Sequence, residues 1–138
     1  MVSAVGPRVR GAGAVPAGWL LLRGDASDPA IDRGQAVQFR RRYPDWGRWG
    51  LSFFGGADPS ALRTLRAERL GRYRVVWIVD PRQLVALGFE VVPTFRTPHV
   101  TVAWSGSLDR GVGELRNLGR AWDDDPYDGT ATDAWRTR

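Results

Sequence analysis

Residues 73–79, YRVVWIV, are the stretch of this 138-residue sequence that decides the fold, because β-branched and aromatic side chains dominate it and predict a strand. Asp80 follows directly and is itself followed by Pro, a pair that predicts a helix start with Asp as the N-cap and Pro in the first turn. The same Asp-Pro pair occurs at Asp28 and Asp58. Residues 73–81 therefore predict a strand followed directly by a helix, and the pairs at Asp28 and Asp58 predict two further helix starts.

The rest of the chain continues this alternation. Apolar runs and alternating patterns predict further strands at 19–23, 51–54, 89–92 and 99–104, and helices after Asp28, Asp58 and Asp80 and at 112–122. We expect an α+β fold, a single compact domain with a mixed, central β-sheet and three or four short helices. The domain is predicted over 18–122, with a flexible N-terminal segment at 1–17 and an acidic polar C-terminal tail at 123–138.

Composition excludes several classes of protein. The chain has no Cys and one His, so disulfides, thiolate chemistry and zinc sites built on sulfur or on paired histidines within one chain are excluded. No apolar run is long enough to predict a membrane span, and we expect no membrane partner. The first residues lack the uninterrupted apolar core of a secretory signal, so we expect a cytoplasmic protein.

The charge of the chain is uneven. All 20 basic residues are Arg, against 15 acids, for a net charge of +5. Residues 1–74 hold thirteen Arg and six acids, a net +7, whereas residues 75–138 hold seven Arg and nine acids, a net −2. A coding bias explains the choice of Arg over Lys, but the positive sign of the first half favours a polyanionic partner, since guanidinium groups bind phosphate in a bidentate geometry.

The densest basic and aromatic cluster is RRRY at 40–43 with WGRW at 46–49. Guanidinium groups suit phosphates and aromatic faces suit unstacked bases, so this cluster predicts an RNA or DNA interface. The alternative is a solvated helix end followed by two core tryptophans. The candidate nucleic-acid-binding residues are Arg40, Arg41, Arg42, Tyr43, Trp46, Arg48, Arg63 and Arg66.

His99 is the one histidine and the natural candidate for proton transfer near neutral pH. Together with arginines it suggests a toxin-like, metal-independent ribonuclease that needs no cofactor, because phosphodiester cleavage requires a proton-transfer group and cations near the developing charge. The alternative is a strand-edge histidine held by hydrogen bonds. A chain of this charge that binds or cleaves RNA is the leading hypothesis.

A second hypothesis comes from WLLLRG at 19–24 and LSFF at 51–54. These segments resemble the Arg-Ser-Glu class of ADP-ribosyltransferase toxin domains. The resemblance implies that Arg23 binds the phosphates of NAD, that Ser52 orients this cofactor, and that a downstream Glu drives transfer. Glu90 and Glu114 are the candidates for that acid.

A third hypothesis is non-enzymatic. The sequence has seven Trp, and a surface rich in Trp could bind another protein, such as an acidic antitoxin-like partner. The acidic segment DDDPYD at 123–128 lacks the ligand spacing of a calcium loop, and we predict no metal site.

Overall fold

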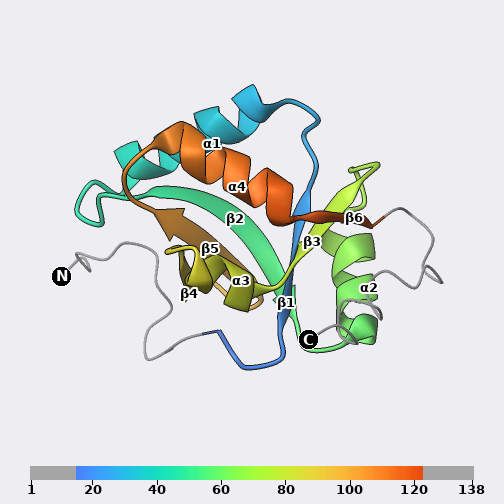
Figure 1. Ribbon diagram of the computed structural model, residues 1–138. Coiled ribbons are helices and arrows are strands. Elements are labelled where there is room, and N and C mark those ends of the chain that lie inside the picture. Colours follow the sequence, from blue (N-terminus) through green and yellow to red (C-terminus); the bar gives the residue numbers. More distant parts are fainter. Residues whose placement is uncertain (1–14, 123–138) are drawn as a thin grey trace.

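The computed structural model describes residues 15–122, which form one six-stranded sheet with the strand order β4-β5-β2-β1-β3-β6. Figure 1 shows helices on both sides of this sheet. In chain order the elements are β1 (Leu20–Gly24), α1 (Pro29–Arg42), β2 (Trp49–Gly56), α2 (Pro59–Arg69), β3 (Val76–Val79), α3 (Pro81–Ala86), β4 (Glu90–Pro93), β5 (His99–Trp104), α4 (Leu108–Leu118) and β6 (Arg120–Trp122).

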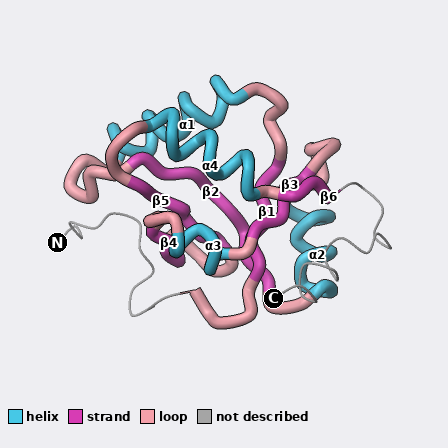
Figure 2. The backbone as a smooth tube through the Cα atoms, in the orientation of Figure 1, coloured by secondary structure: helices cyan, strands magenta, loops and turns pink. Residues whose placement is uncertain are grey.

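The two faces of the sheet carry separate cores, because successive side chains of a strand point to opposite faces. On β1, Leu21 packs with α1 and α4, whereas Leu20 and Leu22 pack against α2. Figure 2 shows α1 and α4 side by side on one face and α2 across the sheet from them. The prediction of an α+β domain with helices on a central sheet is confirmed.

The helix starts follow local sequence chemistry. The carboxylates of Asp28, Asp58 and Asp80 each accept a backbone N–H of the helix that follows, and Pro stands in the first turn of each. The same role at α4 falls to Ser107, whose hydroxyl accepts the N–H of Arg110. All three Asp-Pro helix starts are therefore confirmed.

Three features differ from the expectation. Every strand pairing among residues 15–122 is antiparallel, where the sequence favoured a mixed sheet, because a strand–helix alternation does not fix strand direction. The strand predicted at 73–79 begins only at Val76. The last helix ends at Gly119, whose extended ψ of 134° lets the chain form β6, so Trp122 lies on a strand and not on that helix. The predicted segments 1–17 and 123–138 lie almost entirely outside the described residues.

The late start of β3 has a physical cause in Arg66 on α2. Its buried guanidinium donates to the carbonyl oxygens of Leu70 at 2.6 Å, Tyr73 at 2.7 Å and Arg74 at 3.3 Å. These bonds hold residues 70–74 as a loop around the guanidinium, and the loop presents the Tyr73 side chain at the sheet. No helix among residues 15–122 is long and apolar enough to cross a membrane.

Candidate functional site

A pocket of about 440 Å³ opens between the second half of α1, strand β2 and the loop that follows α2. Among the described residues, its lining contains no Asp or Glu. Four arginines line it, together with five aromatic rings, the single histidine and three uncharged polar side chains. These residues are Arg23, Arg42, Arg69, Arg72, Phe39, Tyr43, Phe54, Tyr73, Phe95, His99, Gln35, Gln38 and Ser52.

Two glycines bring aromatic rings against the sheet at this pocket. A Cβ built at Gly50 on β2 would collide with the ring of Phe39, and one built at Gly24 on β1 would collide with the ring of Tyr73. The rings therefore lie directly on the backbone of the strands. The walls of the pocket are apolar for this reason, and its charge comes from the ends of arginine side chains.

Three of the pocket arginines have no carboxylate partner among residues 15–122: Arg42, Arg69 and Arg72. The guanidinium of Arg69 lies 6.0 Å from the ring centroid of Phe54, and that of Arg72 lies 4.9 Å from the ring centroid of Tyr73. Arg72 also donates to the Tyr73 hydroxyl at 2.8 Å. Contacts with rings and a phenol leave these positive charges uncompensated, so the pocket attracts anions.

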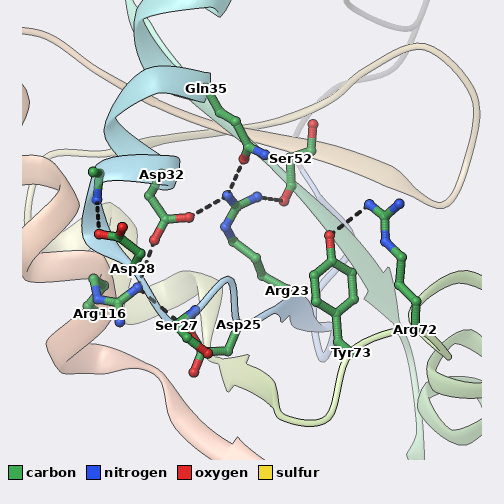
Figure 3. Close-up of polar contacts among 11 residues, drawn as sticks. Arg23, Asp25, Ser27, Asp28, Asp32, Gln35, Ser52, Arg72, Tyr73 and Arg116 are labelled. Carbon is green, nitrogen blue, oxygen red and sulfur yellow. Dashed lines mark hydrogen bonds and ion pairs between the residues drawn. The ribbon is translucent and has the colours of Figure 1, made fainter.

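Arg23 behaves differently because its guanidinium is already engaged. It donates to the backbone oxygen of Ser52 at 2.9 Å, to Oδ1 of Asp32 at 2.7 Å and to Oε1 of Gln35 at 2.6 Å. The other carboxylate oxygen of Asp32 accepts from Arg116 on α4 at 2.8 Å. Figure 3 shows Asp32 between the two guanidinium groups. Arg23 thus joins β1, β2 and α1, and its charge is compensated.

His99 lines the same pocket at the start of β5. Its ring meets Phe54 edge-on at 5.5 Å and Phe95 at 4.9 Å between centroids. Its Nδ1 lies 2.8 Å from the Thr94 hydroxyl. Burial among these neighbours lowers the pKa of His99 below 6.5, because desolvation disfavours the charged imidazolium. This shift favours the neutral imidazole.

Phe95 forms part of the pocket lining on the β4–β5 loop. It is 55% exposed, and its φ of 57° lies in the left-handed region that bulky residues rarely adopt. Its ring contacts Tyr43 at a centroid distance of 6.3 Å. Strain of this kind concentrates at functional sites, since it persists only where the surrounding structure enforces it.

The remaining candidate nucleic-acid residues spread over the fold. Arg42 and Tyr43 line the pocket, but Trp46 is buried against Phe39, and Arg48 pairs with Glu90 at 3.4 Å. Arg40 lies over the ring of Trp49 at 4.2 Å, and Arg41 is exposed. Arg66 is buried, and Arg63 is exposed outside the pocket lining. The predicted cluster is therefore not one continuous surface, and Arg66 and Trp46 belong to the interior.

Sequence reasoning did not assign Arg72, Tyr73 or Phe95 to a site, and it placed Arg63 and Arg66, but not Arg69, among the candidate nucleic-acid-binding residues. Arg69 belongs to an i, i+3 stripe with Arg63 and Arg66, and this spacing alone does not tell which member faces a cavity. Arg72 and Tyr73 have no motif; they reach the pocket because Arg66 holds their loop. Only the fold brings these residues to His99.

A second hollow, of about 530 Å³, lies at the other end of the sheet beside β3 and α3. Its lining includes Asp80 and Arg82, which pair with each other at 2.7 Å, and it contains none of the predicted site residues. Its lining also includes Arg120. Because the pocket around His99 brings together the predicted residues Arg23, Ser52, Arg42 and Tyr43, we place the candidate functional site there. Within residues 15–122 no group of three or more His, Asp or Glu is arranged to bind a metal ion.

Comparison of the chain with family models, with curated proteins and with solved structures found no match. The site is therefore interpreted from its own geometry.

Proposed function

We propose that this protein binds a phosphorylated nucleotide unit of single-stranded RNA in the pocket around His99. The observation that carries the proposal is the combination of Arg42, Arg69 and Arg72 with aromatic rings in one cavity whose described lining holds no carboxylate. A cavity of about 440 Å³ lies within the usual size range of small-ligand sites. Phosphate oxygens match the guanidinium groups, and a base can stack on an aromatic ring.

The distribution of side chains in the pocket supports a nucleotide as the ligand. Tyr43 and Phe95 contact each other and supply ring surface for a base. Arg69 and Arg72 come from the end of α2 and the loop that follows it, and they supply charge for the phosphate. His99 lies in the same cavity and supplies a polar ring nitrogen near the bound ester. Cleavage of RNA, if this site performs it, would use His99 and these arginines.

Binding of a short fluorescent single-stranded RNA, measured by anisotropy, tests the proposal with matched variants. Arg69→Ala and Arg63→Ala remove the same charge from the same helix, but only Arg69 lines the pocket. Arg42→Ala and Arg41→Ala form the equivalent pair at the end of α1. We expect the pocket variants to weaken binding about tenfold, the effect of about 1.4 kcal/mol, and the controls to change it less than twofold.

The salt dependence of binding gives an independent readout. Each lost phosphate contact lowers the slope of log K against log salt by about 0.7 for a single strand. We therefore expect Arg69→Ala to flatten the slope by about that amount. Equal losses in the pocket variants and in their controls would show that binding follows net charge and does not use the pocket, and the proposal would then fail.

A second candidate function, NAD binding as in ADP-ribosyltransferases, is favoured by one observation: Arg23 and Ser52 line the same cavity. Against the transfer chemistry, Glu90 pairs with Arg48 and Glu114 with Arg110, and neither lines the pocket. Titration calorimetry with NAD separates the candidates. The Ser52→Ala variant is the sharper probe, because Arg23 bonds to the backbone oxygen of Ser52, which this substitution keeps. NAD binding that is lost in Ser52→Ala would support this candidate, and absence of NAD binding in the unmodified protein would exclude it.

A further inference from the structure

Behind the pocket, two buried hydroxyl groups form a chain that ends on His99. The Thr101 hydroxyl lies 2.7 Å from the Thr94 hydroxyl, which lies 2.8 Å from Nδ1 of His99. Thr94 and Thr101 are almost completely buried, with exposed fractions of 0% and 1%. Backbone bonds fix the same unit, since Thr94 N–H donates to the His99 carbonyl at 3.1 Å. Each hydroxyl proton of this short chain must therefore be donated to a neighbouring oxygen or ring nitrogen, and the donor of each bond remains to be assigned.

Only one direction of the chain satisfies every buried donor. If Nδ1 of His99 carried the proton and donated to Thr94, then Thr94 would donate to Thr101, and the Thr101 hydroxyl proton would have no acceptor among residues 15–122. In the opposite direction, Thr101 donates to Thr94 and Thr94 donates to Nδ1, so both hydroxyl protons are bonded. A buried donor without an acceptor is unfavourable, and this selects the second direction.

We infer that Thr94 fixes His99 as the neutral tautomer that carries its proton on Nε2, so that His99 offers the pocket a hydrogen-bond donor. Within residues 15–122, Nε2 has no hydrogen bond to the protein, and it is the ring nitrogen left to meet a ligand. Thr94 is a positioning residue, because it acts on the ligand only through His99. The tautomer depends on the hydroxyl chain alone and not on the identity of the ligand.

The role of Nε2–H toward a bound phosphate rests on the proposed function, whereas the tautomer itself does not. A neutral Nε2–H donates to an acceptor such as a non-bridging phosphate oxygen, and it cannot accept a proton at that nitrogen. In the resting protein His99 therefore acts beside the arginines as a further donor to the phosphate. It is not poised as a general base toward the pocket, and this limits the ways in which an RNA hydroxyl could be activated there.

Nitrogen-15 NMR of the ring tests the tautomer directly, and the chain offers a single histidine, so its signals need no assignment. The spectrum of the unliganded full-length protein is recorded at pH 8, where an imidazole with a pKa below 6.5 is neutral. We expect a protonated Nε2 and an unprotonated Nδ1. A protonated Nδ1, or nearly equal populations of the two tautomers, would overturn the inference.

Variants of the two threonines test the role of the hydroxyl chain. Thr94→Ser keeps the hydroxyl and should keep the Nε2–H tautomer, whereas Thr94→Val removes it and should move the population toward Nδ1–H. Thr101→Val should leave the tautomer unchanged, because Thr94 still donates to Nδ1. A shift in Thr101→Val with none in Thr94→Val would contradict the direction that we infer. If Thr94→Val does not fold, the unmodified protein, Thr94→Ser and Thr101→Val decide the matter.

Adenosine 5′-monophosphate serves as the probe for the ligand part. We expect saturating nucleotide to move the Nε2–H proton signal downfield, as a new hydrogen bond to phosphate requires, while adenosine without phosphate leaves it in place. Binding of the monophosphate without that movement would refute His99 as a phosphate donor. If neither the monophosphate nor RNA binds, the proposed function is refuted. The tautomer is measured on the unliganded protein, so that result does not affect it.

Discussion

Among the described acidic side chains, Asp32 on α1 is the one whose removal should destabilise the fold most. Its carboxylate accepts from Arg23 at 2.7 Å and from Arg116 at 2.8 Å, and its side chain is only 6% exposed. Asp32→Ala would leave two guanidinium groups facing each other across an emptied space. The side chains of Arg23 and Arg116 are 14% and 25% exposed, so water could compensate them only in part.

The magnitude follows from this geometry. Removing one partner of a buried ion pair costs about 3–5 kcal/mol. Arg23 keeps Gln35 and the Ser52 carbonyl, and Arg116 keeps Asp25 at 3.8 Å, so the lower end of that range applies. We expect Asp32→Ala to lower the free energy of unfolding by about 3 kcal/mol. For a chain of this length that corresponds to a fall in Tm of roughly 10 °C.

Urea unfolding followed by circular dichroism measures this loss, and Arg116→Ala is the matched comparison. That variant keeps the bond between Asp32 and Arg23 and removes a side chain that water already reaches, so we expect a loss of about 1–2 kcal/mol. Two results would refute the reasoning that Asp32 compensates both arginines. One is a loss below about 1 kcal/mol in Asp32→Ala, and the other is a greater loss in Arg116→Ala than in Asp32→Ala.

Three further predictions concern the stability of the fold. Arg66→Met should lower stability by about 3 kcal/mol in urea unfolding, because carbonyl groups that accept from a buried guanidinium lose their donor; a loss below about 1 kcal/mol would contradict that role. Gly111→Ala should lower stability by at least about 1–3 kcal/mol, since the new Cβ would collide with the buried indole of Trp104, and an unchanged Tm would disprove the close approach. Because burial lowers the folded-state pKa of His99, the unfolded chain takes up a proton first as pH falls below about 6.5. Stability should therefore decrease from pH 7 to pH 5 more steeply in the unmodified protein than in His99→Gln, and parallel curves would show that the imidazole does not contribute.

Local sequence signals predicted the parts of the fold that depend on a few adjacent residues. The Asp-Pro pairs at 28, 58 and 80 predicted three helix starts, since an N-cap carboxylate and a proline act within one turn. The alternating pattern at 99–104 predicted the strand β5. Strand direction was not predictable in this way, because it depends on how a connection crosses the sheet.

The residues of the candidate site also fall into those that local sequence predicted and those that only the fold brings in. His99, Arg23, Ser52, Arg42 and Tyr43 were predicted as functional residues from their type and local motif, and the fold brings all of them to one pocket. The arginines that complete it could not be chosen from the sequence, because Arg63, Arg66 and Arg69 repeat at the same spacing and have three different environments. Arg63 is exposed, Arg66 is buried under backbone carbonyls, and Arg69 lines the cavity.

Net charge alone is therefore a poor guide to where this chain would bind an anion. Its strongest carboxylate contacts compensate arginines that hold the scaffold together, as Asp32 does for Arg23 and Arg116. The charges of Arg42, Arg69 and Arg72 stay uncompensated because the described lining of the pocket holds no Asp or Glu. We propose that the excess of positive charge acts at this place, because a neutral His99 adds a hydrogen-bond donor there without adding a repelling cation.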